Sequence, residues 1–518
     1  MSHSQILSIN GKRGFKLLSV AAAVAVLAAC GSLAPKAIEA PELVQTNQAD
    51  TAAMRQGVEP VTGPLTLDEA MARALKYNLD RRARLMEESI ALQQLDVTRF
   101  DMLPKLVAQA GYSDRSRERA TFSQRYNPVS PYGDVGTMDR TTSSYSSAAD
   151  HSTADLGLTW NLLDVMVGQT SAKQAADRVL IAAEKRRKAM HVLMQDVRTV
   201  YWRAVSAQKL RDQVQATQKM AEAALTDARQ AEAERLRSPL DSLRYQRQLL
   251  ENLRLLEAIS QELSTAQVEL ASLINAPVGQ SITLAEAGGD FSHDTPLTTP
   301  MAQLEAVALE NNADLREQHY NGRVARAEVR KTMTRLFPNL SFNYSVKYDS
   351  DEYLVHNNWN EAGLQLSFNL FNLLTGPTQI KFAEAGVALA DQRRMAMQMA
   401  VVTQLHLARL QLQNARAQFN RADAIYSVDN KIAENIRARQ SVQAQSQLDR
   451  VANETTAILS LLRRYQALSQ VHLAESRLIA NLGLEPKIGS TGDLTLAQLT
   501  EQVKGNPWAA LTATPAAK

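Results

Sequence analysis

Hydrophobic and polar residues alternate one by one in two runs between Asn339 and Phe371. The first run, 339–348, reads NLSFNYSVKY, and the second, 362–371, reads AGLQLSFNLF. Alternation with a period of two predicts β-strands that have one apolar and one polar face. About ten residues is also the length that a tilted strand needs to cross a bilayer. The pattern therefore predicts a hairpin joined by 349–358, either on a soluble domain or in a membrane wall.

A second pair of alternating runs lies in the first half of the chain. Residues 106–112 alternate weakly, and residues 155–162 alternate clearly, with Leu156 and Trp160 among the apolar positions. These runs predict two more strands with an apolar face. Residues 113–153 are rich in Ser, Thr, Tyr, Arg and Gly and lack apolar periodicity, which predicts a long loop between strands.

Long helical patterns follow both pairs of strands. From about Gly168 the helical pattern continues for roughly seventy residues, which corresponds to roughly 100 Å. Pro239 interrupts this pattern, and a returning helix is expected up to about Ala276. Apolar residues in these helices recur at spacings of four and three, which is typical of coiled coils and predicts core packing.

A helix is also expected ahead of the first pair of strands. Thr66 and Glu69 match a capping box at its start, and Pro104 is expected to end it after Leu103. Residues 31–64 are rich in Ala, Pro, Gln and Thr without sustained periodicity, so they are expected to form an extended leader.

The second half of the chain repeats the first. Leu75–Asp80 matches Leu309–Asp314 at an offset of 234 residues, and Trp160–Asp164 matches Phe368–Asn372 at an offset of 208. The difference of 26 residues lies between the strands, so the longer hairpin loop belongs to the first copy. The predicted fold is mainly α with a β portion, built from two tandem repeats of helix, strand, strand, long helix and helix.

Four strands cannot enclose a pore by themselves. A sheet that spans a bilayer must close, because unpaired backbone groups in lipid cost several kcal/mol each, and bacterial barrels begin at about eight strands. Several copies of the chain are therefore expected to share one barrel. Its polar face is then expected to line a wet lumen, with Ser341, Asn343, Gln365, Ser367 and Asn161. The residues expected to face lipid are Leu340, Phe342, Leu366, Phe368, Leu156 and Trp160.

The N-terminus is predicted to be a processing segment. Basic residues precede an apolar stretch from Leu17 to Ala29, which is too short to span a bilayer as a helix. The sequence Leu-Ala-Ala-Cys-Gly ending at Gly31 resembles a bacterial lipobox, in which Cys30 is acylated, as with palmitate; an ordinary signal peptide with an incidental Cys is the alternative. Because Cys30 is the only cysteine, no intrachain disulfide is possible. The expected boundaries are a signal peptide at 1–29, a lipidated leader at 30–64, a first repeat at 65–276, a linker at 277–300, a second repeat at 301–486 and a C-terminal tail at 487–518.

Composition narrows the function. With 57 Lys and Arg against 54 Asp and Glu, the net charge of +3 gives no indication of nucleic-acid binding. Eight His residues are scattered without metal-ligand spacing, and no Gly-rich phosphate loop or nucleophile elbow follows a strand. We therefore expect no enzyme activity, no cofactor and no metal.

The repeat and its strand-to-helix junctions, LTWNLLDVMVG at 158–168 and LSFNLFNLLTG at 366–376, resemble the TolC-like outer membrane channel (efflux protein) family. The resemblance extends over about 65–486 and includes the Leu-Asp steps at 240–241 and 448–449. It implies a homotrimer with a shared 12-strand barrel in outer membrane lipid and an α-helical tunnel in the periplasm. It also implies docking to a periplasmic adaptor (membrane fusion) protein and an inner-membrane pump. The lipobox, followed by Gly31, implies the lipoprotein branch and an outer membrane location.

The resemblance also implies a periplasmic aperture at the helix turns near 233–241 and 437–449. Family members often carry acidic residues after the second turn, where this chain has Asp449; the next position of that pattern is Ala452, and Gln443 replaces the usual Gly. A single ring of Asp449 is expected, unless Asp449 is there only because the helix dipole favours it. Five arginines lie around both turns: Arg235, Arg237, Arg437, Arg439 and Arg450. Each is expected to form an ion pair with another protomer, to contact the adaptor, or simply to be solvated at a helix end.

Three functions are consistent with these expectations. The first is a passive exit duct of a tripartite efflux system, with energy supplied by the inner-membrane partner. The second is the outer membrane duct of type I protein secretion. The third is a structural envelope lipoprotein without a pore, which leaves the four alternating strands unexplained.

Overall fold

The structure is a computed structural model of the 518-residue chain. It forms two compact units, Met1–Val58 and Glu59–Lys518. The expected signal peptide at 1–29 and Cys30 lie outside the described residues. The structure describes 37–122, 143–234, 238–280, 282–285, 295–440, 447–484, 494–505 and 507–512.

The described part of the first unit contains one helix, α2 (Ala40–Arg55), in which no residue is buried. The leader was expected to be extended, so that prediction was wrong for these sixteen residues. Pro41 lies in the first turn, where backbone amides have no partner within the helix, so the missing N–H of proline costs no hydrogen bond. Glu42 in the first turn and Arg55 in the last turn lie at the ends where the helix dipole favours their charges.

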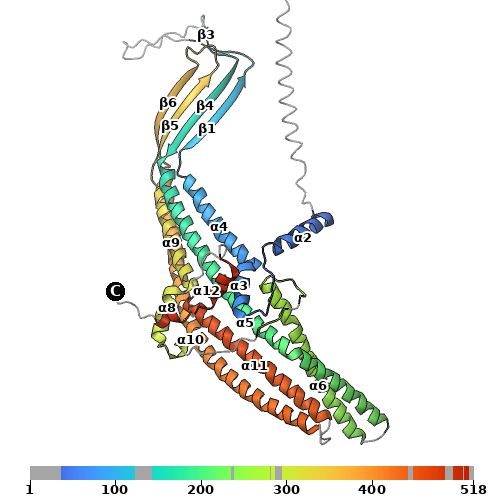
Figure 1. The fold of residues 1–518 in the computed structure, drawn as a ribbon. Coiled ribbons are helices and arrows are strands. Elements are labelled where there is room, and N and C mark those ends of the chain that lie inside the picture. The colour runs from blue at the N-terminus through green and yellow to red at the C-terminus, as the bar shows by residue number, and fades with distance from the viewer. Residues whose placement is uncertain are drawn as a thin grey trace, which may run out of the picture. The chain divides into compact units, whose positions relative to one another are not determined.

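The second unit is mainly helical, and its two halves have the same order of elements (Figure 1). Four strands gather at one end of this unit, and the long helices extend away from them. The first half contains α3 (Leu67–Tyr77), α4 (Leu79–Phe100), β1 (Lys105–Asp114), β4 (Asp150–Asn161), α5 (Leu162–Ala233) and α6 (Pro239–Leu273). The second half contains α8 (Met301–Asn311), α9 (Ala313–Arg335), β5 (Asn339–Asp349), β6 (Asn358–Ser367), α10 (Asn372–Gln440) and α11 (Gln447–Leu482).

The helix expected from Thr66 to Leu103 is in fact two helices, separated by Asn78. Thr66 caps α3 as expected, because its side chain accepts a hydrogen bond from Glu69 N. The Asn78 side chain caps α4 and also donates to Leu273 O at the end of α6, at 3.1 Å. The equivalent Asn312 of the second half caps α9 and donates to Asn481 O at 3.1 Å. A long-range contact of the same kind therefore breaks the first helix of each half.

Both returning helices end in a residue with left-handed backbone. Asn275 has φ of 54° after α6, and Gly483 has φ of 64° at the equivalent position after α11. The following amides bond back to the helix, from Ala276 N to Ala271 O at 2.8 Å and from Leu484 N to Ile479 O at 3.1 Å. A Cβ at Gly483 is excluded by Asn311 O, which lies 2.2 Å from its position.

The helices of the second unit pack side by side in two overlapping groups. Near the sheet, α4 packs on α5, α5 on α9, and α9 on α10; farther away, α10 packs on α11, α11 on α5, and α5 on α6. Leucine, alanine and valine residues fill the contacts among α5, α6 and α11, as the coiled-coil spacing predicts. No helix in the described ranges is both long and apolar enough to cross a membrane.

Ion pairs join α5 of the first half to α9 of the second half. Glu184 is buried and pairs with Arg316 at 2.7 Å, while Asp177 pairs with Arg323 at 2.6 Å. Buried carboxylates need such partners, because an unpaired buried charge is strongly destabilising. The two repeats are thus joined by a polar seam as well as by an apolar core.

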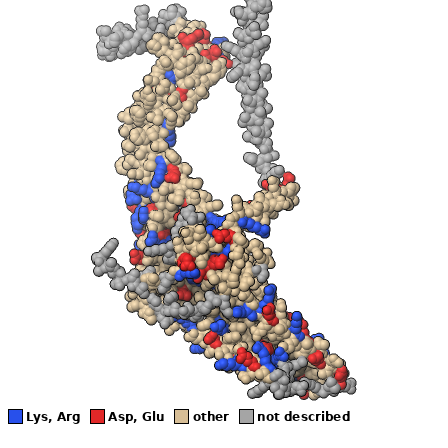
Figure 2. Space-filling model, viewed as in Figure 1, with Lys and Arg blue, Asp and Glu red and all other residues tan. Residues whose placement is uncertain are grey.

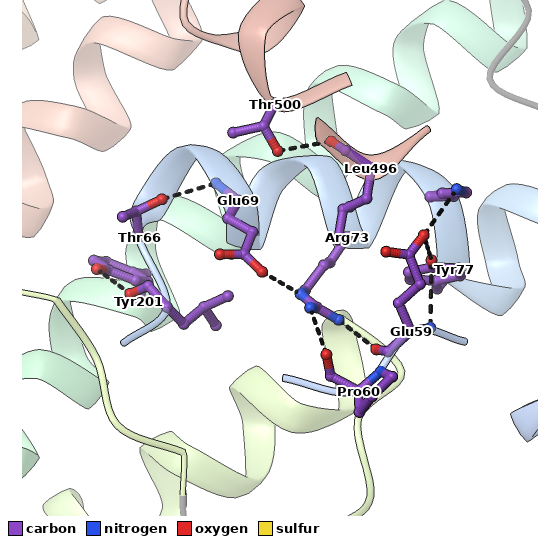
Figure 3. Close-up of polar contacts among 11 residues, drawn as sticks. Glu59, Pro60, Thr66, Glu69, Arg73, Tyr77, Tyr201, Leu496 and Thr500 are labelled. Carbon is purple, nitrogen blue, oxygen red and sulfur yellow. Dashed lines mark hydrogen bonds and ion pairs between the residues drawn. The ribbon is translucent and has the colours of Figure 1, made fainter. Parts of the chain in front are cut away.

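A buried arginine ties α3 to the chain that precedes it (Figure 3). The Arg73 guanidinium donates to Glu69 Oε1 at 2.8 Å, to Glu59 O at 2.6 Å and to Pro60 O at 3.0 Å. The Tyr77 hydroxyl donates to the Glu59 carboxylate at 3.0 Å. The start of the second unit is therefore held by polar contacts that an amphipathic helix pattern does not reveal.

The C-terminal region expected as a tail includes two short helices, α12 (Leu496–Val503) and α13 (Ala509–Thr512). Helix α12 packs on α3, where Thr500 lies above the α3 contacts in Figure 3. Trp508 is only 1% exposed, and its Nε1 donates to Glu475 Oε1 at 3.1 Å. The region 277–300, expected as a linker, contains the short helix α7 (Thr295–Thr298).

Candidate functional site

The four long strands form one antiparallel sheet in the order β1-β4-β5-β6. Strand β6 (Asn358–Ser367) starts and ends about four residues earlier than the predicted strand at 362–371. Phe368 therefore lies one residue beyond the end of β6, and the prediction that it belongs to the strand was wrong. The Asn369 side chain accepts a hydrogen bond from Phe371 N at 3.1 Å and turns the chain into α10. The alternation of apolar residues thus continues beyond the end of the strand.

One face of the sheet is apolar from strand to strand. Residues directly opposite each other on paired strands share a face, and the register pairs Trp160 with Phe342 and Leu340 with Leu366. Leu156 lies four residues before Trp160 on β4 and so shares this face. Five of the six residues predicted to face lipid are therefore gathered on one side of the sheet.

These apolar side chains are exposed in the single chain. Leu364 is 72% exposed and Leu366 is 69% exposed, although both belong to an ordered strand. Soluble monomers rarely expose a continuous apolar surface of this kind, because its contact with water is unfavourable. The sheet therefore needs a covering of lipid or protein.

The opposite face of the sheet is polar, as predicted. Ser341 is paired with Asn161 on one side and with Gln365 on the other, and Asn343 lies opposite Thr159 in the next row. Lys347 Nζ forms an ion pair of 2.5 Å with Glu361 Oε2 on this face. Such a surface is compatible with water.

The two edges of the sheet, β1 and β6, are open. Every residue of β6 is exposed, and so is nearly every residue of β1. Each edge presents a row of unpaired backbone groups, which invites pairing with another strand. In lipid such pairing is obligatory, because no water is present to satisfy these groups.

The region expected as a long loop, 113–153, includes regular strands. It contains the end of β1 and two short paired strands, β2 (Arg119–Phe122) and β3 (Ser143–Ser147). Hydroxyl-rich residues such as Ser143–Ser147 lack apolar alternation, so their pairing could not be seen from the pattern. Residues 123–142 lie outside the described part of the chain.

Asp351 joins the two hairpin loops at the outer end of the sheet. Its carboxylate accepts hydrogen bonds from Ser147 Oγ at 2.6 Å, from Ala148 N at 3.0 Å and from Tyr353 N at 3.0 Å. These donors hold the pKa of Asp351 below its ordinary value, led by the Ser147 hydroxyl. Acidic side chains gather at this end of the sheet (Figure 2).

The edge helices near the sheet also carry exposed apolar side chains. Helix α4 packs on α5 but has an exposed apolar stripe on its outer side, and α10 has a corresponding series along its length. The α4 stripe consists of Leu79, Met86, Ile90, Val97 and Phe100. The α10 series includes Leu374, Phe382, Leu389, Met399, Leu407, Leu410, Ile425, Val428 and Ile432.

Arg437, one of the arginines predicted to surround the aperture, has a partner within its own chain. Its guanidinium binds the Glu454 carboxylate of α11 through Nε and Oε1, and through Nη2 and Oε2 at 2.6 Å. Glu454 is only 5% exposed, and this hydrogen bond raises the pKa of Arg437 above its ordinary value. Sequence reasoning missed Glu454 because a single acidic residue in a helix does not reveal its partner, and the equivalent residue of the first repeat is the uncharged Gln246.

The other predicted aperture residues are only partly described. Arg235 and Arg237 lie outside the described residues. Arg439 belongs to α10 and Asp449 to α11, but both side chains are outside the described part. Arg450 is half-buried in the first turns of α11. Helix α5 ends at Ala233 and α6 begins at Pro239, while α10 ends at Gln440 and α11 begins at Gln447.

No protein-family model matches the sequence, and no curated protein matches it. Solved structures do match. The Campylobacter jejuni CmeC outer membrane channel is 14% identical, with a TM-score of 0.60 over 85% of this chain and 89% of that chain. The open state of the Neisseria gonorrhoeae MtrE outer membrane channel is 16% identical, with a TM-score of 0.57 over 79% of this chain and 88% of that chain. The chain has the TolC-like outer membrane channel fold. VceC, an outer membrane protein of Vibrio cholerae, is 13% identical, with a TM-score of 0.57 over 80% of this chain and 96% of that chain.

Within this TolC-like fold, a cluster of buried polar groups joins α5 to α11. The His472 ring stacks on Trp202, with ring centroids 5.2 Å apart and an angle of 7° between the planes. Burial, together with the nearby charge of Arg198, lowers the pKa of His472 to about 3. Arg198 also donates to Ser476 Oγ. The cluster therefore joins the two repeats of the TolC-like fold.

The described residues of the TolC-like fold include no group of three or more His, Cys, Asp or Glu placed to hold a metal ion. The buried polar groups of the helices instead make contacts between helices, as Glu184 does with Arg316 and Glu454 with Arg437. The features left for function are the two faces of the sheet, its open edges and the helix turns.

Proposed function

We propose that this chain is the outer membrane channel of a tripartite efflux system, a passive duct without catalytic activity. The observation that carries the proposal is the four-stranded sheet, which has one apolar face, one polar face and two open edges. A water-filled pore through lipid needs the two faces, and closure of the sheet needs further strands.

The chain acts as a homotrimer. Three copies of the four-stranded sheet supply a 12-strand barrel, in which β6 of one copy pairs with β1 of the next. The exposed apolar stripes of α4 and α10 belong to the helices at the two edges near the sheet, so the same arrangement covers them. One assembly therefore both pairs the open edges of the sheet and covers the exposed apolar side chains of the helices.

The faces of the barrel follow from the register. Leu340, Phe342, Leu366, Leu156 and Trp160 face outer membrane lipid, and the polar face lines the lumen. Phe368 follows the strand and lies at the periplasmic boundary of the lipid. The helices continue from the barrel as a periplasmic tunnel.

The aperture lies at the helix turns. A ring of Asp449 from three copies narrows it, with Arg439, Arg450, Arg235 and Arg237 around the tips. Arg437 is assigned a different role, because its ion pair with Glu454 stiffens the hairpin of α10 and α11. The periplasmic adaptor docks at these tips and connects the duct to an inner-membrane pump, which supplies the energy.

Acylation of Cys30 adds a lipid anchor to the barrel. The support for it is the lipobox pattern that ends at Gly31 after a basic and apolar segment. A single acyl chain binds membranes only marginally, whereas several chains together with a barrel anchor the protein stably.

The test uses the purified full chain. Native mass spectrometry is expected to give a three-chain assembly, and planar-bilayer recording is expected to give a conducting pore that widens after Asp449→Ala. A protein that remains monomeric, or that conducts no current with or without Asp449→Ala, contradicts the proposal. In cells, deletion of the chain is expected to cause retention of small dyes; retention of an exported protein alone would assign it to type I secretion.

A further inference from the structure

Trp359 is the only Phe, Tyr or Trp on the polar face of the sheet within its four described strands. The register places it directly opposite Lys347 on β5, which in turn lies opposite Asp155 on β4. The ion pair between Lys347 and Glu361 independently shows that β5 and β6 present these side chains on one face. The other aromatic residues of the strands all lie on the apolar face: Tyr112, Trp160, Phe342, Tyr344 and Tyr348.

The indole of Trp359 is not needed to fill a core. Its side chain is 40% exposed, and the next two residues on the same face of β6 are Glu361 and then Gly363. A Cβ added at Gly363 meets no atom within 4 Å, so there is open space over this part of the sheet. Glu361 thus lies between the indole and this glycine on the polar face of β6.

Carboxylates outnumber cations around this indole. Glu361 and Asp155 contribute two negative charges, and Lys347 contributes one positive charge that is engaged with Glu361. Asp155 Oδ1 has no hydrogen-bond partner among the described residues. Three assembled copies thus carry three indoles and an excess of three negative charges at one level.

The ring face of Trp attracts cations that approach within about 6 Å, and nearby carboxylates strengthen this attraction. Flat aromatic groups also stack on an indole through their apolar surface. We propose that Trp359, Asp155 and Glu361 form a transient contact site in the barrel lumen for organic cations that carry an aromatic ring. This site rests on the channel function proposed above and assigns to it a preferred class of cargo.

The test is open-channel block in a planar bilayer. Benzyltrimethylammonium is expected to reduce the single-channel current of the unmodified trimer at lower concentration than benzenesulfonate, which has the same ring and the opposite charge. Tetramethylammonium, which has the charge without the ring, is expected to block more weakly. Trp359→Leu is expected to raise the half-blocking concentration of benzyltrimethylammonium about fivefold.

Tyr348→Leu is the matched control, because Tyr348 neighbours Lys347 on β5 but points to the opposite face. Its half-blocking concentration is expected to equal that of the unmodified trimer. Asp155→Asn is expected to weaken block by the cation without creating block by benzenesulfonate. Equal block in the Trp359→Leu channel, or equal block by both charges, overturns the cation site while the pore proposal stands. A trimer without any pore overturns both.

Brominated lipids give a second readout that does not depend on current. They quench tryptophans that touch lipid, so Trp160→Leu is expected to remove the quenched fraction of the fluorescence. Trp359→Leu is expected to leave this fraction unchanged, because its indole faces the lumen. Loss of the quenched fraction in Trp359→Leu places the indole in lipid and overturns the site.

Discussion

Replacement of Gly483 by Ala tests the joint between the two parts of the second repeat. Gly483 has φ of 64°, and an added Cβ lies 2.2 Å from Asn311 O, 2.5 Å from Asn311 C and 2.9 Å from Asn311 Cβ. None of these atoms belongs to the far end of a flexible side chain that can simply rotate away. The end of α8 must move, and Asn312, which follows it, caps α9 and holds Asn481 O.

The expected cost has two parts. A left-handed backbone costs a residue with a Cβ about 1–2 kcal/mol relative to Gly. Loss of the hydrogen bond from Asn312, which is 4% exposed, costs about another 1–2 kcal/mol. We therefore expect Gly483→Ala to lower the free energy of unfolding by about 2–4 kcal/mol, without any change in the charges of the duct.

Circular dichroism at increasing denaturant concentration measures this loss in the purified protein. Two control variants separate the effect of steric strain at Gly483 from the general effect of exchanging Gly with another residue. Gly386→Ala lies in the interior of α10 with nothing within 4 Å of its new Cβ, and is expected to gain up to about 1 kcal/mol. Asn275→Gly, at the equivalent left-handed position of the first repeat, is expected to be neutral or slightly stabilising. A Gly483→Ala protein as stable as the unmodified chain would refute the reasoning.

Four other changes have definite expected outcomes. Glu454→Gln is expected to lower the stability of the α10–α11 hairpin by about 1–2 kcal/mol, measured by hydrogen exchange, because its arginine partner is 40% exposed and keeps part of its hydration. The same change is expected to leave conductance unaltered, whereas Asp449→Ala is expected to raise it. The stability contributed by neutral His472 is expected to be lost as pH falls from its ordinary pKa of 6.5 towards about 3, by at most about 1.4 kcal/mol per pH unit, and His472→Gln is expected to flatten this dependence in denaturant titrations. Asp351→Ala removes two hydrogen bonds between the hairpin loops and one within the second loop, and is expected to accelerate cleavage of the loops by added protease. Cys30→Ser is expected to abolish the acyl mass increment while the trimer still assembles.

Each of these expectations has a result that contradicts it. Higher conductance after Glu454→Gln would show that this carboxylate belongs to the aperture, and unchanged conductance after Asp449→Ala would remove the acidic ring. An unchanged pH dependence in His472→Gln would assign the acid sensitivity to other groups. Loop cleavage at the original rate after Asp351→Ala would mean that other contacts hold the loops. An acyl mass on the Cys30→Ser protein would exclude Cys30 as the modified residue.

The long elements of the fold are visible in the sequence because their signals recur over many residues. The helix α5 was expected from about Gly168 and begins at Leu162, and Pro239 begins the returning helix where the chain was expected to break. The apolar face of the sheet follows from simple alternation, since apolar residues such as Leu340 and Phe342 take turns with polar ones along β5. Repetition of these patterns at constant offsets made the two halves recognisable.

The missed features depend on contacts between distant residues. Asn78 breaks a helical pattern because its side chain reaches Leu273 O, which is 195 residues away. Phe368 continues an alternation that Asn369 ends through a local hydrogen bond. Glu454 resembles any other charged residue of a helix until α10 brings Arg437 against it. Such partners are set by packing, so periodicity carries no information about them.

The helix α5 passes without interruption through 72 residues, from the last residue of β4 to the first helix turn. At a rise of about 1.5 Å per residue, this is a rod of about 108 Å. A rod of that length acts as a lever: a tilt of about one degree at the sheet end moves the far end by about 2 Å, which exceeds the radius of a water molecule, about 1.4 Å. Small changes of angle at the sheet are therefore enough to displace the helix turn at the opposite end of α5.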